Sequence, residues 1–130
     1  MLTTQLRNEV NNALAGEQLS LKMMLPHLNF AIDQINSTLN TVFPVFTEST
    51  TEYTAFPDKW IRQVVVPAAA HHYFVVDDEG RTSEQNFSQL YQQGLFFMLR
   101  DYSHCIPDEY LDDEDNGTVN DAWEVRGIWL

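Results

Sequence analysis

The chain has 130 residues, the size of one domain that can bury its own hydrophobic core. Its 44% hydrophobic residues, with three Trp, five Tyr and eight Phe, exclude a disordered chain. Seven Lys and Arg against nineteen Asp and Glu give a formal net charge of −12, which argues against binding to nucleic acid or to an anionic membrane.

The N-terminal residues predict a short surface helix. Thr3 or Thr4 is expected to cap it, and Gly16 is expected to end it. Its apolar face repeats at helical spacing: Leu6, Val10 and Leu14. No basic segment followed by an apolar run opens the chain, and no apolar run reaches membrane-spanning length, so we expect an intracellular protein with no membrane partner.

A second helix is expected within residues 19–39. Its apolar stripe contains five residues: Leu28, Ala31, Ile32, Ile35 and Leu39. Pro26 leaves two possibilities, a start near Met24, which we favour, or an earlier turn from Leu21 that Pro26 kinks.

Residues 41–56 have no helical period, but aromatic residues recur through them: Phe43, Phe46, Tyr53 and Phe56. Sixteen residues is long for a loop in a compact domain. We favour aromatics that plug the end of a helical bundle, and the alternative is a contact surface for another subunit.

The most apolar stretch, Phe56–Gly80, predicts the central helix. Pro57 is placed at its first helical position, and Gly80 at its end. Pro67 deprives the Gln63 carbonyl of its helical donor and should kink or split the helix. Strands at residues 64–66 and 73–76 are the competing interpretation.

The last predicted helix has the cleanest period in the chain. Its apolar positions are Phe87, Leu90, Tyr91, Gly94, Leu95, Met98, Leu99 and Tyr102. Thr82 and Gln85 have the spacing of a capping box before it. Gly94 on the buried face predicts close approach of another helix, and we expect the central helix and this one to form an antiparallel pair.

Pro107 closes this helix, and the composition then becomes acidic. We divide the chain into a helical domain, residues 1–106, and an acidic linker with a C-terminal arm, residues 107–130. The arm carries five large apolar residues: Trp123, Val125, Ile128, Trp129 and Leu130. It could fold back on the helices of its own domain, act as a binding segment for a partner, or add a strand to a partner's sheet.

Candidate chemistry is sparse, and we expect neither an enzyme nor a cofactor. Residues 112–123 resemble a calcium-binding loop, but Trp123 stands where the closing Glu is needed. His71 and His72 are adjacent and cannot chelate one ion together, and the spacing of His27 and His104 supplies no zinc site, so structural histidines are favoured. Cys105 is interpreted as a small buried hydrophobe.

Three consecutive carboxylates, Asp77, Asp78 and Glu79, follow the central helix at the negative end of its dipole. They are either simply solvated or meet basic residues of a neighbouring subunit.

Three segments resemble the head–tail connector proteins of tailed bacteriophages, also called portal adaptor or neck proteins. These are AIDQINSTLN, YTAFPDKWIRQVVVPAAAHHYFVVDDEG and NFSQLYQQGLFFMLRDY, and the resemblance covers roughly residues 19–102. It implies a small helical bundle, one subunit of a ring, usually of twelve copies, that lies beneath the portal and extends the DNA channel toward the tail.

We therefore expect an all-α protein, a four-helix bundle-like domain with a long aromatic loop between the second and third helices and an extended acidic C-terminal arm. The resemblance implies four partners: the portal protein through Trp123–Leu130, neighbouring copies in the ring, a tail-side neck or tail protein, and double-stranded DNA that passes without specific binding. Asp77–Glu79 would be subunit-interface or channel acids. The protein would be found in the virion neck, and in the host cytoplasm during assembly. The alternative is a small acidic interaction protein, such as a DNA-mimicking inhibitor of a host nucleic-acid enzyme.

Overall fold

The structure is a computed structural model that describes residues 1–14, 17–76 and 84–112. The described residues form helices and irregular segments, without a named strand, so the predicted all-α class is confirmed. The elements are α1 (Thr3–Ala13), α2 (Leu21–Leu39), α3 (Asp58–Trp60), the π-helical segment η1 (Ile61–Val65), α4 (Val66–Val76), α5 (Glu84–Tyr102) and the 3₁₀ turn η2 (Asp108–Tyr110). None of the described helices is long and apolar enough to cross a membrane.

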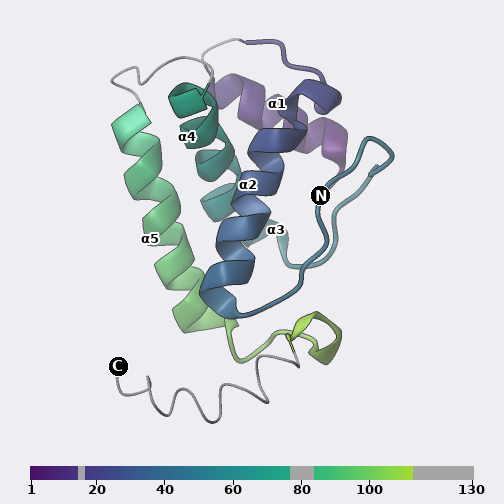
Figure 1. Cartoon of the computed structure of the whole chain (residues 1–130), viewed down its shortest axis with the longest axis vertical. Coiled ribbons are helices and arrows are strands. Elements are labelled where there is room, and N and C mark those ends of the chain that lie inside the picture. Colours follow the sequence, from purple (N-terminus) through teal and green to yellow (C-terminus); the bar gives the residue numbers. More distant parts are fainter. Residues whose placement is uncertain (15–16, 77–83, 113–130) are drawn as a thin grey trace.

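Helix α4 is the centre of the molecule, as its apolar sequence predicts. It packs against α5 on one side and α2 on the other, and α1 crosses behind it (Figure 1). α4 and α5 run antiparallel, as expected. Ala68, Ala69 and Ala70 are fully buried, and their small side chains let three neighbouring helices come close.

Helix α1 is a surface helix that buries one stripe, made by Leu6, Val10 and Leu14. The prediction that Thr3 or Thr4 caps it is wrong, because the cap position is Leu2 and no side chain caps the helix. The Thr3 hydroxyl instead donates to the Thr50 carbonyl, 3.0 Å away. Gly16, its predicted end, lies outside the described residues.

Helix α2 begins at Leu21, so the favoured start near Met24 is wrong. Ser20 is the N-cap, and its hydroxyl accepts a hydrogen bond from the Met23 amide at 3.3 Å. Pro26 lies in the second turn with its ring exposed, so it removes one early helical bond without entering the core. The helix ends at Asn40, which has a left-handed φ of 57°.

The helical interpretation of the central stretch is confirmed, and Pro67 has a specific effect on it. Pro57 is the N-cap rather than the first helical residue. The predicted kink takes the form of η1, one turn of π-helix that ends just before Pro67, and the Val66 amide donates to the Ile61 carbonyl five residues back. The predicted end at Gly80 and the capping box at Thr82 and Gln85 are outside the residues whose side chains are described.

Residues 41–57 form an ordered loop whose aromatics are buried in the domain's own core, as favoured above, but they cover the flank of the bundle beside α2 rather than its end (Figure 1). Phe43, Phe46, Tyr53 and Phe56 are only 1–3% exposed. Phe46 stacks on Tyr53 with ring centroids 4.4 Å apart, and the Tyr53 hydroxyl donates to the Pro44 carbonyl at 2.6 Å. The N-terminus is tied to the same loop, since the Met1 amino group donates to the Tyr53 carbonyl at 2.8 Å.

Two asparagines of α2 hold this loop by its backbone. The Asn29 side chain donates to the Phe46 carbonyl at 3.1 Å and accepts from the Phe46 amide at 2.7 Å. Asn36, seven residues later, makes the same pair of bonds with Phe43, at 3.2 and 2.9 Å. Seven residues are two helical turns, so both asparagines lie on one side of α2.

The chain stays on the helical body beyond Ile106. The Val42 amide donates to the Tyr110 carbonyl at 2.8 Å, and the Tyr110 ring lies 5.0 Å from that of Phe43. The Asp112 amide donates to the Asn40 carbonyl at 3.3 Å. Within the predicted linker, Tyr110, Leu111 and Asp112 thus contact the body. Cys105 is exposed, and its interpretation as a buried hydrophobe is wrong because the chain turns away from the core after Tyr102.

Candidate interaction surface

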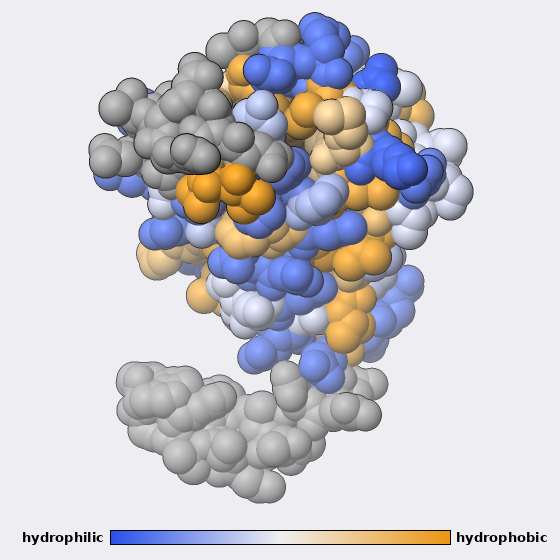
Figure 2. All heavy atoms as spheres, turned by 45° about the horizontal axis from the view of Figure 1, so that its top comes forward, coloured by the Kyte–Doolittle hydropathy of each residue, from blue (hydrophilic) through white to orange (hydrophobic). Residues whose placement is uncertain are grey.

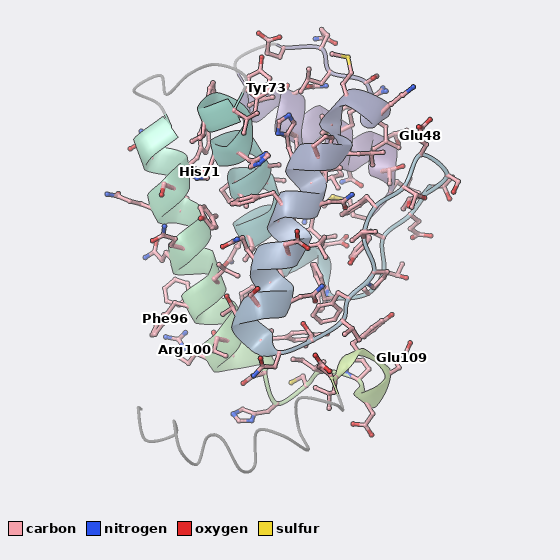
Figure 3. The ribbon with its side chains drawn as sticks, viewed as in Figure 1. Glu48, His71, Tyr73, Phe96, Arg100 and Glu109 are labelled. Carbon is pink, nitrogen blue, oxygen red and sulfur yellow. The ribbon has the colours of Figure 1, made fainter. Side chains whose placement is uncertain are left out.

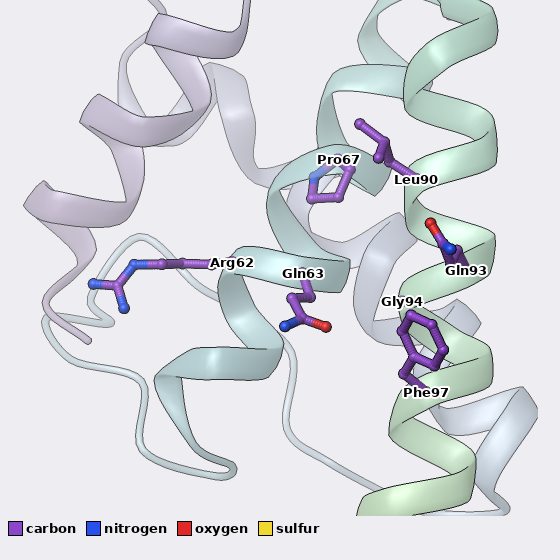
Figure 4. A pocket seen from close by; sticks show the side chains of 7 residues that line it. All are labelled: Arg62, Gln63, Pro67, Leu90, Gln93, Gly94 and Phe97. Atoms are coloured by element: carbon purple, nitrogen blue, oxygen red, sulfur yellow. The ribbon is translucent and has the colours of Figure 1, made fainter.

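An open groove lies where η1 and the start of α4 meet the middle of α5 (Figure 4). Its volume is about 380 Å³, and seven residues line it: Arg62, Gln63, Pro67, Leu90, Gln93, Gly94 and Phe97. Sequence reasoning anticipated two of its causes, the missing donor at Pro67 and the close helix approach at Gly94, but not the groove that they form together.

The floor of the groove is backbone, because two special residues face each other there. Pro67 has no N–H, so it cannot supply the α-helical hydrogen bond to the Gln63 carbonyl. That carbonyl lies directly against Gly94: a Cβ built on Gly94 would overlap the Gln63 oxygen and lie 3.0 Å from Val64 Cγ2. The predicted close approach is confirmed, and it leaves α5 without a side chain at this point.

The wall of the groove on α5 is apolar and partly open to solvent. Leu90 is 50% exposed, although its helical period predicts burial. Leu99, nine residues later, is 41% exposed. Nine residues turn a helix by about 900°, so these two leucines lie on opposite flanks of α5. The apolar face of α5 predicted from residue spacing is therefore wider than the part of α5 that α2 and α4 cover.

Basic side chains border the groove. The Arg62 Nε lies 3.3 Å from Glu9 Oε2 on α1. The Arg100 guanidinium lies 4.9 Å from the Phe97 ring and donates two hydrogen bonds to Asp101, at 2.7 and 2.9 Å. The hydrogen bond from Arg100 lowers the pKa of Asp101, and nearby Lys59 contributes to the same shift.

The outer side of α5 also presents an aromatic group to solvent. Phe96 is 59% exposed and, with Arg100, points away from the helices (Figure 3). Its ring lies 5.7 Å from the Phe97 ring and 6.0 Å from the Arg100 guanidinium. Elsewhere, hydrophilic side chains cover most of the face seen in Figure 2, and apolar ones reach the surface in separate patches.

The histidines connect helices. Nδ1 of His27 on α2 lies 2.8 Å from Nδ1 of His72 on α4, which requires one ring to donate and the other to accept. Phe30 stacks on His72 with ring centroids 4.5 Å apart. Within residues 1–14, 17–76 and 84–112, no group of three or more His, Cys, Asp or Glu could hold a metal ion.

The predicted site residues lie outside the described ranges. These are the acids Asp77, Asp78 and Glu79 and the apolar residues of the arm, Trp123, Val125, Ile128, Trp129 and Leu130. Most of the calcium-loop-like segment, residues 113–123, lies outside them as well. The groove and the outer aromatic group on α5 are thus the candidate surface among the described residues. They combine a concave apolar surface with guanidinium groups, a combination suited to binding another protein segment.

Comparisons with protein-family models, with curated proteins and with solved structures found no match for this chain.

Proposed function

We propose that this protein is a head–tail connector subunit of a tailed bacteriophage, which forms a ring under the portal, extends the DNA channel and joins the head to the tail. The observation that carries the proposal is the cluster on α5 formed by the exposed Phe96 and Arg100 and the partly buried Phe97 between them and the core. Aromatic residues and arginine are enriched at protein interfaces. A ring subunit needs two lateral contact surfaces, and this cluster supplies one on the side of the bundle.

The charge supports the same proposal. A net charge of −12 per subunit places a high negative charge around a ring, and an acidic channel wall repels the DNA backbone, so DNA slides without sticking. Asp77, Asp78 and Glu79 follow directly after α4 in the sequence and are our candidates for channel or interface acids. Trp123, Val125, Ile128, Trp129 and Leu130 are our candidates for portal docking, with a neck or tail protein on the opposite side of the ring.

The test is assembly on the portal protein encoded by the same phage. The purified full chain is mixed with portal rings, and the product is measured by light scattering and negative-stain microscopy. Two variants are compared with it: a double variant that carries Trp123→Ala and Trp129→Ala, and the single variant Phe96→Glu. Val45→Glu is the control for Phe96→Glu, because Val45 is 50% exposed on the loop after α2.

Addition of a second ring by the unaltered chain supports the connector function. Loss of addition in the double tryptophan variant assigns portal docking to the arm, and loss in Phe96→Glu but not in Val45→Glu assigns the lateral contact to α5. If the unaltered chain adds no ring to the portal, the connector proposal is wrong.

A further inference from the structure

The groove between η1 and α5 has the features of a binding site for an aromatic side chain. Leu90 and Phe97 form an apolar wall, and Gly94 and Pro67 leave a floor of backbone and pyrrolidine ring. Its volume of about 380 Å³ lies at the small end of the range for ligand pockets. Because the half-exposed Leu90 remains in contact with water, covering this wall would gain hydrophobic free energy.

Most of the described basic residues gather on this side of the molecule, together with acidic partners. The described ranges contain five Lys and Arg residues, and three of them, Lys59, Arg62 and Arg100, are at or near the groove. Arg62 and Arg100 are paired with Glu9 and Asp101, so in a chain with a net charge of −12 an acidic segment meets less repulsion here than on most other surfaces. The groove therefore suits an apolar segment and tolerates acidic residues before it.

One segment of the chain has this composition and lies within reach. The acids Asp112–Asp115 come first, and the apolar segment Trp123–Leu130 follows. Asp112 contacts Asn40, at the end of the bundle where α5 also ends (Figure 1). Residues 113–122 can span up to about 33–36 Å, whereas Gly94 lies only about 12 Å up α5 from Tyr102.

We propose that the groove between η1 and α5 binds the tryptophan-bearing segment Trp123–Leu130 of the same chain, with a tryptophan ring against Pro67, Leu90 and Phe97. The acidic residues before the segment pass the guanidinium of Arg100. Binding within one chain is favoured over binding between chains, because a short tether gives an effective concentration in the millimolar range. This docked state belongs to the free chain, and the segment would leave the groove to dock on the portal of the proposed function. The groove is therefore tested on the free chain, separately from the connector function.

The test uses the full chain labelled with 5-fluorotryptophan and observed by ¹⁹F NMR. Trp60 is only 3% exposed and serves as the internal reference for a folded core. Leu90→Glu places a charge in the groove, and Leu99→Glu is the matched control, with the same substitution on the opposite flank of α5. Gln93→Glu, at an exposed position of the groove, is a second variant that leaves every apolar contact of the core in place.

We expect the resonances of Trp123 and Trp129 in the unaltered chain to be displaced from the positions that they have in a peptide of residues 119–130. Leu90→Glu and Gln93→Glu should return them to the peptide positions, with roughly a tenfold rise in the undocked fraction. Leu99→Glu and a tenfold dilution should leave them unchanged.

Three results would overturn the proposal. The first is peptide-like resonances in the unaltered chain, and the second is an equal response to Leu90→Glu and Leu99→Glu. The third is displacement that fades on dilution together with a fall in molecular mass, which would place the segment on a second copy.

Discussion

At the scale of single residues, Gly94 shows how one missing side chain shapes the surface. The Gln63 carbonyl of η1 packs against the Gly94 backbone, where a Cβ would overlap the oxygen. Pro67 has no N–H with which to give that carbonyl its α-helical hydrogen bond. Glycine in a helix costs about 1 kcal/mol relative to alanine, so this position gives up helix stability for close contact. The missing side chain of Gly94 thus accounts both for the close contact and for the groove next to it.

Gly94→Ala should therefore destabilise the protein although alanine is the better helix former. The new methyl group overlaps the Gln63 oxygen, and overpacking of this kind costs about 1–3 kcal/mol, which exceeds the propensity gain. Urea unfolding should show a lower midpoint for Gly94→Ala, while the exposed neighbour Gln93→Ala should stay within about 0.5 kcal/mol of the unaltered chain. A midpoint at or above that of the unaltered chain would mean that η1 moves aside without cost.

Tyr53 makes the stability of the folded protein depend on pH in the alkaline range. Burial, with a smaller contribution from Tyr110, raises the pKa of the Tyr53 hydroxyl far above its ordinary value of about 10. The unfolded chain loses this proton near pH 10 and the folded chain does not, so the stabilisation is complete below about pH 10 and is lost as the pH rises further.

Tyr53→Phe should remove this pH dependence. At neutral pH the variant loses the hydrogen bond to Pro44 and about 1 kcal/mol of stability. From about pH 10 upward the unaltered chain loses up to about 1.4 kcal/mol per pH unit through this group, so the two unfolding free energies converge. Thermal unfolding at a series of pH values measures the difference, and a constant gap up to about pH 11 would contradict the assignment.

At the scale of elements, asparagine side chains on the helices hold the irregular segments in place by hydrogen bonds to their backbone. Asn11 binds both the amide and the carbonyl of Leu19 at 3.1 Å, as Asn29 does with Phe46 and Asn36 with Phe43. Each side chain satisfies one donor and one acceptor of a loop residue that a strand partner would otherwise supply. The loop after α2 is fixed in this way with its aromatics turned inward.

Asn29→Ala should loosen the loop 41–57 more than any surface change on the same helices. It leaves the amide and carbonyl of Phe46 without their partners, at a cost of about 2–3 kcal/mol. Hydrogen exchange of the Phe46 amide should accelerate more than that of amides in α4. The control Asn12→Ala, at an exposed position of α1, should leave both stability and exchange nearly unchanged.

Periodicity predicts the helices well because burial in this bundle repeats with the helical turn. The buried stripes of α1 and α2 and the central role of α4 follow from apolar spacing alone. Asn29 and Asn36 could not be found in this way, since an asparagine on a helix is expected to face water whether or not a loop folds over it. Leu90 and Leu99 were predicted as core for the opposite reason: spacing shows the width of an apolar face but not how much of it the neighbours cover.

At the scale of the whole molecule, two features oppose each other. A net charge of −12 keeps copies apart, while Phe96 and its neighbours on α5 present apolar area that water disfavours. The repulsion is long-ranged and screened by salt, whereas the apolar contact is short-ranged and not screened. Salt should therefore decide whether copies associate, and a partner that neutralises charge would have the same effect.

We expect the mass of the full chain in solution to rise with salt. The Debye length falls from about 10 Å at 0.1 M to about 3 Å at 1 M, which removes most repulsion between copies. Light scattering should show the monomer at low salt and larger species at high salt. Phe96→Glu should stay monomeric throughout, because the substitution removes the aromatic contact on α5.

Val45→Glu makes the same charge change at a comparably exposed position on the loop, and it should associate like the unaltered chain. If both variants lose association equally, net charge alone controls it and α5 is not the contact surface. If the unaltered chain stays monomeric at high salt, the prediction that α5 carries association between copies is wrong.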